Sequence, residues 1–109
     1  MQLGEAIRSL RGAAGLSQQQ LADDLEISPS YLSLVESNKR EPTVTLVRRI
    51  AARLGAPASL LFAAALAGSH DSPEHRYERE AVESLLAAAR HLVTINRFEA
   101  AGPTAKRKR

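Results

Sequence analysis

The chain has 109 residues, of which 44% are hydrophobic and 25% are charged, and this balance fits one small folded domain and excludes a collagen-like or wholly disordered polymer. Its net charge is +3, and four of its 15 Lys and Arg residues are the last four residues of the sequence. The other 11 are outnumbered by 12 Asp and Glu residues, so the positive charge belongs to a basic tail. The absence of cysteine excludes a disulfide framework and a cysteine-based zinc site, and no apolar run approaches the roughly 20 residues that span a bilayer.

The first part of the chain predicts two helices. Apolar residues recur at the spacing of one helix face up to Ala14, and Gly15 is the kind of residue that ends a helix. Ser17 and Gln20 then form an S-x-x-Q capping box, which predicts the start of a second helix that reaches Leu25. No stretch of the chain alternates apolar and polar residues as a half-buried strand does, so we expect an all-α fold.

Three more short helices follow. Ser28 before Pro29 is typical of a helix start, because the hydroxyl caps the first turn and proline has no N–H to lose there. Asn38 tolerates the left-handed conformation and ends this third helix. Thr43 begins a fourth helix, and a fifth covers about residues 57–66.

The rest of the chain divides into a linker, one long helix and a tail. Residues 68–73 form a linker between a domain over residues 1–67 and an amphipathic helix over residues 74–101, while residues 102–109 form a basic tail that we expect to be disordered. We expect the apolar stripe of the long helix to pair with a second copy of the chain rather than to fold back, because the five-helix unit closes without it and so wide a stripe needs burial. The residues assigned to this dimer contact are Val82, Leu85, Leu86, Ala89, Leu92 and Val93.

A specific pattern surrounds the two short helices that are predicted over residues 17–25 and 28–37. Its members lie in one continuous register and are Gly4, Glu5, Ile7, Arg8, Leu10, Arg11, Gly15, Leu16, Ser17, Gln18, Leu21, Ala22, Ser28 to Ser33, Glu36, Lys39, Pro42, Leu46, Ile50, Ala51, Leu54 and Gly55. Over residues 2–66 this pattern resembles the Cro/phage-repressor type of helix-turn-helix domain, the XRE family. The resemblance implies a five-helix DNA-binding domain that binds as a dimer and whose recognition helix is residues 28–37.

The resemblance also implies which residues meet DNA. The base-facing positions are Pro29, Ser30, Ser33 and Leu34, and the positions expected at phosphates are Gln18, Ser28, Tyr31, Asn38, Lys39 and Arg40. Arg11 and Glu36 match a pair that in the family forms a partly buried salt bridge between the first helix and the end of the third.

The sequence departs from the family pattern at three positions. Family members often carry Arg, Gln or Lys at the positions of Pro29 and Leu34, and those side chains form hydrogen bonds with guanine or adenine. Neither Pro29 nor Leu34 can form such bonds through its side chain. Contact with thymine methyl groups, bridging water and DNA shape are the remaining means of readout. Glu26 stands in a turn where the family often has glycine. If this position is left-handed, Glu costs about 1–2 kcal/mol relative to an unstrained conformation.

We expect a cytoplasmic transcriptional regulator, either a repressor or an autoregulator, that binds an inverted-repeat operator in double-stranded DNA as a homodimer. The cytoplasmic assignment rests on an N-terminus without a signal-peptide pattern. Within this class the alternatives are an antitoxin whose C-terminal helix holds a small toxin protein, and a controller protein of a restriction–modification system. Outside the class, a protein–protein adaptor could keep the fold without base readout.

No sequence pattern supports an enzyme or a cofactor. No serine lies in a nucleophile-elbow or triad context. His70, Asp71, Glu74 and His75 could be written as a metal cluster, but no two histidines stand four residues apart, so we interpret them as a polar linker and a charged first helical turn. We therefore expect no metal, no cofactor and no membrane partner.

Overall fold

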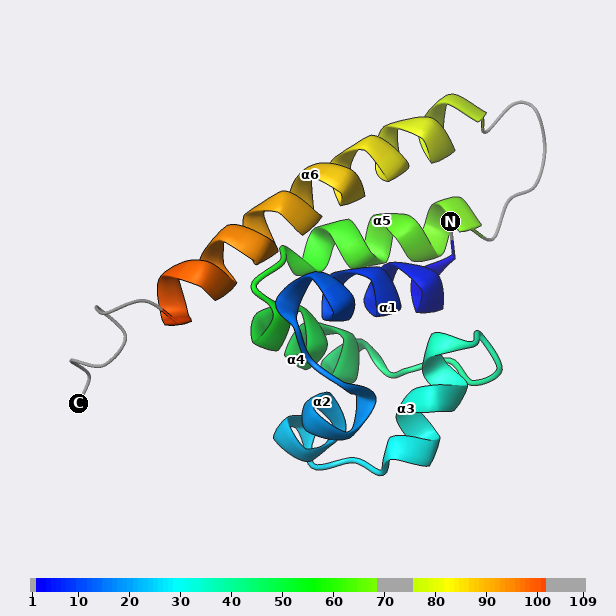
Figure 1. Cartoon of the computed structure of the whole chain (residues 1–109). Coiled ribbons are helices and arrows are strands. Elements are labelled where there is room, and N and C mark those ends of the chain that lie inside the picture. The colour runs from blue at the N-terminus through cyan, green and yellow to red at the C-terminus, as the bar shows by residue number, and fades with distance from the viewer. Residues whose placement is uncertain (1, 69–75, 102–109) are drawn as a thin grey trace.

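The computed structural model describes residues 2–68 and 76–101, and all regular structure in this part of the chain is helical (Figure 1). In chain order the helices are α1 (Leu3–Ala14), α2 (Gln18–Leu25), α3 (Pro29–Glu36), α4 (Val44–Leu54), α5 (Ala58–Gly68) and α6 (Arg76–Ala101). The predicted all-α fold, with five short helices before one long helix, is confirmed. The predicted tail, the cluster around His70 and all of the predicted linker except Gly68 lie outside the described residues.

Helices α2, α3 and α4 each begin at a side-chain cap. Ser17 Oγ accepts a hydrogen bond from the Gln20 N–H at 3.0 Å, and Gln20 Oε1 accepts one from the Ser17 N–H at 2.8 Å, which is the predicted capping box. Ser28 Oγ accepts from the Tyr31 N–H at 3.0 Å, and Thr43 Oγ1 accepts from a backbone N–H of α4 at 3.1 Å. These bonds satisfy N–H groups that a first turn leaves unpaired, so the caps determine where the helices start.

Among the residues that the structure describes, four adopt the left-handed conformation close to a helix end. They are Gly15 and Gly55, with φ of 77° and 78°, and the two non-glycine residues Glu26 and Asn38, with φ of 59° and 64°. Asn38 suits this conformation because its short polar side chain can bond locally, as the sequence predicted. Glu26 does not, so the turn between α2 and α3 holds about 1–2 kcal/mol of strain that glycine would relieve.

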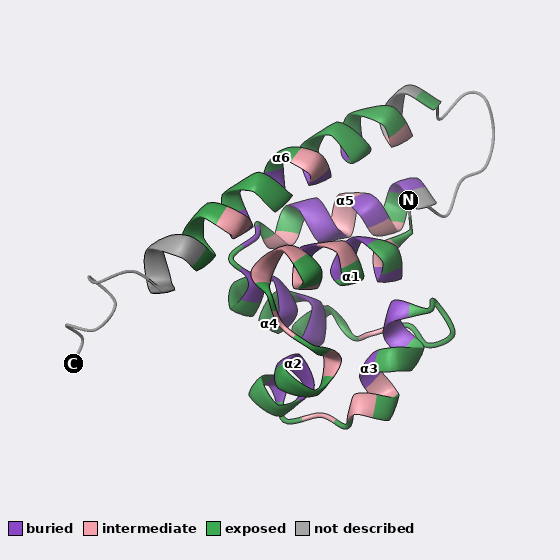
Figure 2. Ribbon diagram, in the orientation of Figure 1, coloured by how far each residue is buried: buried purple, intermediate pink, exposed green. Residues whose placement is uncertain are grey.

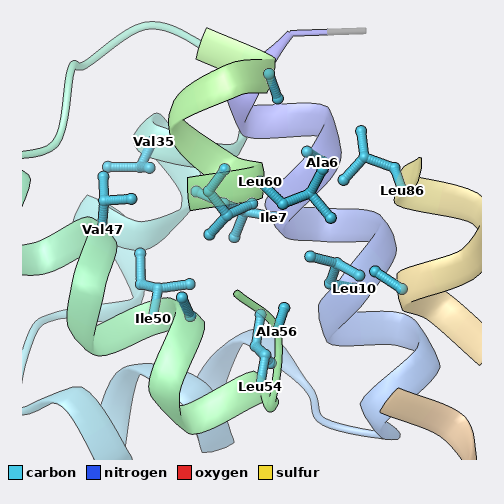
Figure 3. Close-up of a cluster of buried hydrophobic side chains, with 14 of the residues drawn as sticks. Ala6, Ile7, Leu10, Val35, Val47, Ile50, Leu54, Ala56, Leu60 and Leu86 are labelled. Atoms are coloured by element: carbon cyan, nitrogen blue, oxygen red, sulfur yellow. The ribbon is translucent and has the colours of Figure 1, made fainter. Parts of the chain in front are cut away.

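Helix α1 is the centre of the core. It packs against α3, α4, α5 and α6, and Ile7 and Leu10 on its inner face are completely buried. Figure 3 shows these two side chains turned toward Ile50 of α4 and Leu60 of α5. The buried residues form one continuous cluster that runs from α1 through α6.

Helix α6 turns back and runs along α1 and α5 (Figures 1 and 2). Arg90 Nη1 donates a hydrogen bond to Ser9 Oγ at 3.1 Å, and Thr94 Oγ1 donates to the carbonyl of Ala13 at 3.4 Å, so polar contacts also tie α6 to α1. This packing differs from the expected pairing of the whole stripe with a second copy. Four of the six residues assigned to that contact are buried within the chain's own core, namely Val82, Leu86, Ala89 and Val93. The other two, Leu85 and Leu92, are 56% and 50% exposed.

The composition of α5 explains why α6 folds back. Over its whole length α5 has no charged residue, with the sequence ASLLFAAALAG. A helix that is apolar on every side is stable in water only when more than one side is covered. Helices α1 and α4 cover part of α5, and α6 covers another part. The expectation that the five-helix unit closes without α6 was therefore wrong. No helix among the described residues is long and apolar enough to cross a membrane.

Candidate nucleic-acid interface

Helices α2 and α3 form a helix-turn-helix at the end of the molecule that lies away from α6 (Figure 1). The inner side of α3 is held by Leu32 and Val35, which are fully buried. Its outer side consists of Ser30 and Ser33, which are exposed, and Leu34, which is 38% exposed. Pro29, the fourth residue expected to face bases, is half-buried in the first turn of the helix. The outer face of α3 is therefore small, uncharged and open.

The last residue of α3 is a carboxylate that is completely buried. Arg11 of α1 grips the Glu36 carboxylate with two bonds, from Nε to Oε2 at 2.7 Å and from Nη2 to Oε1 at 3.0 Å. Gln18 Nε2 donates a third bond to Glu36 Oε1 at 2.8 Å. A buried carboxylate is tolerated only when its lone pairs are satisfied in this way. Each of the two oxygens has a partner, so the charge is stable inside the protein.

These bonds set the geometry of the helix-turn-helix. The remaining terminal nitrogen of Arg11, Nη1, donates to the carbonyl of Leu16 at 2.9 Å, one residue before the α2 cap. Arg11 and Glu36 thus join the start of α2 to the end of α3 and to α1. Gln18, expected at a phosphate, uses one N–H of its side-chain amide on Glu36 and has a second N–H for another acceptor. The carboxylate therefore also orients the amide group that we expect to meet DNA.

The loop after α3 presents two exposed cations. The backbone N–H groups of Lys39 and Arg40 both donate to the carbonyl of Leu34, at 2.9 and 3.2 Å, so this loop folds tightly over the helix end. The two side chains remain exposed, and the Arg40 guanidinium lies 5.3 Å from the centre of the Tyr31 ring. Such a cation–π contact limits where Arg40 can reach.

Asn38, another residue expected at a phosphate, has a structural contact that the sequence did not indicate. Its Oδ1 accepts a hydrogen bond from the Gly4 N–H at 2.9 Å, which satisfies one of the free donors at the start of α1. Ser28, also expected at a phosphate, caps α3 as the sequence predicted. The resemblance had implied only a DNA contact for these two polar side chains.

Arg8 was missed by the sequence interpretation. Its side chain is 58% exposed, and its Nε lies 3.8 Å from Glu36 Oε1, so this cation stands beside Gln18 at the end of α3. Arg8 lies three residues before Arg11, a spacing that places both side chains on one helix face, and this was the signal that could have found it. By contrast, Arg53 of α4 forms an ion pair with Asp24, in which Arg53 Nε lies 2.6 Å from Asp24 Oδ2.

The arrangement has no feature of a catalytic or metal site in the part of the chain that the structure describes. No group of three His, Asp or Glu side chains there could hold a metal ion. The only buried charged residue among the described positions is Glu36, and its oxygens are bonded to Arg11 and Gln18. What the site offers is an open helix face with polar and cationic side chains at its border, which suits contact with a large anionic partner.

Comparison with known proteins agrees with this geometry. A family model described as "Helix-turn-helix" matches residues 7–61, half of the chain. Two similar proteins are the "HTH-type transcriptional regulator RamB" of Mycobacterium tuberculosis strain CDC 1551 / Oshkosh and the protein of the same name from strain ATCC 25618 / H37Rv. Each is 44% identical over 57 residues, which is 52% of this chain but only 12% of the relative's length. No solved structure matches the chain significantly.

Proposed function

We propose that this chain, which belongs to the Cro/phage-repressor type of the helix-turn-helix family, binds double-stranded DNA through α3 and regulates transcription. The observation that carries the proposal is the open outer face of α3 (Ser30, Ser33 and Leu34) with Lys39 and Arg40 beside it. A helix of this kind fits the major groove of B-DNA. In finer detail, we propose a homodimer that binds an inverted repeat and represses or autoregulates a promoter by blocking it.

The affinity in this proposal comes from the two exposed cations of the loop after α3, Lys39 and Arg40. Residues 1–67 carry seven basic and six acidic residues, so their total charge favours DNA only slightly. Three of the cations, Arg8, Arg11 and Arg53, already lie within 4 Å of carboxylates. Lys39 and Arg40 lie in the loop after α3 and are exposed, with Glu41 as the next residue. Phosphate contacts from this loop would fix the position of α3 without selecting a sequence.

The most direct test of regulation is footprinting of the DNA upstream of the gene for this chain. We expect protection of an inverted repeat whose half-sites lie about one helical turn apart, as two symmetric recognition helices require. Protection of a single half-site would contradict the proposed homodimer. No protection there, and no enrichment of any duplex from a random pool, would contradict DNA-binding regulation itself.

Replacing Lys39 with Ala should weaken binding to operator and to random DNA alike. The side chain is exposed and we assign it to a phosphate, so its loss removes about one released counterion and lowers the salt slope of the binding constant by about one. Binding measured over a series of salt concentrations gives both numbers. Arg53→Ala is the matched control, because that cation is held by Asp24 and should leave the slope unchanged. A Lys39 variant that lost only operator binding would contradict the phosphate assignment.

Replacing Leu34 with Ala should weaken operator binding by about 1 kcal/mol, about fivefold. Leu34 is partly exposed between small side chains, so it forms an apolar ridge that fits a thymine methyl group in the major groove. Replacing the facing thymine with uracil should cost a similar amount, and the two losses should not add, because both remove one contact. Additive losses, or an unchanged affinity of the Leu34 variant, would leave DNA shape as the basis of selectivity.

A further inference from the structure

Helix α6 carries two apolar stripes, each with alternating separations of three and four residues, and only one of them is covered. The covered stripe is Val82, Leu86, Ala89 and Val93, all buried against α1 and α5. The second stripe is Leu85, Ala88, Leu92 and Ile95, in which the three large side chains are 50–56% exposed. Its members are separated by three, four and three residues, the spacing of a helix that packs on another helix. From Leu85 to Ile95 the stripe is about 15 Å long.

An apolar groove lies beside the second stripe, where α6 meets α5. It has a volume of about 500 Å³ and is lined mainly by small side chains, including Ser59 and Ala63 of α5 and Ala88 and Ala89 of α6. Its large residues are Leu60 of α5, which is buried, and Leu85 and Leu92 of α6, which project from the surface. One surface therefore contains both projecting leucines and an apolar hollow beside them, which is the self-complementarity that a two-fold symmetric interface requires.

The residues beside the stripe favour a second copy over a charged partner. The residues next to the stripe on its open side are Ser84 and His91, and Asn96 continues the other side. No carboxylate, Lys or Arg lines the groove. Two copies of this chain would therefore bring no pair of like charges from Asp, Glu, Lys or Arg together at the seam, and opposite charges on a partner would find no counterpart there.

We propose that a second copy of this chain docks in the α5–α6 groove, with Leu85 and Leu92 of each copy inserted into the groove of the other. The dimer is isologous, and its two-fold axis passes near Ala88, midway between the two leucines. This inference rests on the proposed function, because it assigns a surface to the homodimer proposed there. It confines the contact to the exposed stripe and leaves the buried stripe in the core of each copy.

The first test is the oligomeric state of the full chain, measured by sedimentation equilibrium. The double variant Leu85→Glu/Leu92→Glu should raise the dimer dissociation constant at least about tenfold, because desolvated carboxylates are not tolerated in an apolar seam. Both side chains are at least half exposed in the single chain, so the helical circular dichroism should not change. Val44→Glu is the matched control, since Val44 is 58% exposed on α4 and does not line the groove.

The second test uses the absence of cysteine from the chain. Ala88→Cys should form an intermolecular disulfide under mild oxidation, because two residues near a two-fold axis come within the Cα separation of about 4.4–6.8 Å that a disulfide needs. Gly12→Cys is the control, since a side chain there meets nothing within 4 Å and lies on α1, outside the groove. Equal cross-linking of the two variants would overturn the proposed axis.

The two proposals fail differently. A wild-type chain that stays monomeric at about 100 µM, both alone and with duplex DNA, overturns the groove dimer even if the monomer binds DNA. A dimer that is unaffected by the double Glu variant overturns the assigned surface. Binding of a different protein's helix in the groove, with the chain itself monomeric, also overturns it. A dimer that cross-links through Ala88→Cys and binds no duplex leaves the inference standing and overturns the proposed function.

Discussion

Replacing Arg11 with Ala should lower the free energy of unfolding by about 3 kcal/mol. Glu36 is fully buried, and removing its bidentate partner leaves a carboxylate with too few donors in a site that water does not reach. The expected loss lies at the lower end of the range for such pairs, because Gln18 still donates to the same carboxylate at 2.8 Å. In a domain of this size the midpoint of thermal unfolding should fall by roughly 12 °C or more.

Urea denaturation of the Arg11 variant gives this free energy directly. The matched control is Arg53→Ala, which breaks an ion pair of similar length with Asp24, whose two side chains are 44% and 40% exposed. An exposed pair of this kind contributes at most about 1 kcal/mol. If the two variants lost equal stability, burial of Glu36 would not be what makes the Arg11 pair important.

Replacing Gly4 with Ala should cost about 2–3 kcal/mol, the second largest effect that we expect. An added Cβ would lie 2.5 Å from the backbone oxygens of both Val35 and Glu36, and backbone cannot turn aside as a flexible side chain can. Helix α1 approaches the end of α3 this closely because residue 4 has no side chain. The variant must therefore push α3 away from α1 and lengthen the bond between Asn38 Oδ1 and the residue-4 N–H.

The same helix supplies the control for this variant. A Cβ at Gly12 meets nothing within 4 Å, so Gly12→Ala should stabilise α1 by up to about 1 kcal/mol through helix propensity alone. Thermal unfolding of the two variants should thus move in opposite directions. Equal midpoints would show that the close approach of α1 to α3 relaxes without cost.

The short helices could be predicted because their boundaries are local. The signals that set these boundaries act within a few residues of one another: a Ser or Thr at the cap, a Gly or Asn at the end, and apolar residues at helical spacing. Tertiary packing did not override these signals at α2, α3 or α4. The left-handed Asn38 was predicted for the same reason. The position of α6 was not, because it depends on how much of α5 the other helices cover.

The candidate site was predictable in residue identity but not in partners. The resemblance predicted the base-facing positions, of which Ser30, Ser33 and Leu34 are exposed in the structure and Pro29 is half-buried. The bond from Gln18 to Glu36 and the bond from Gly4 to Asn38 join residues 18 and 34 positions apart, and no periodicity indicates such pairs. Arg8 was missed because the sequence alone does not show that α1 packs against the end of α3.

We propose that the outer face of α3, with the loop after it, is the DNA-binding surface. We would titrate the isotopically labelled full chain with a duplex enriched from a random pool and follow the backbone amide resonances. We expect the largest shifts at residues 28–40 and at residues 17–18, where the exposed helix face, Lys39, Arg40 and Gln18 lie. Shifts confined to α6, or none with duplex in excess, would contradict the claim.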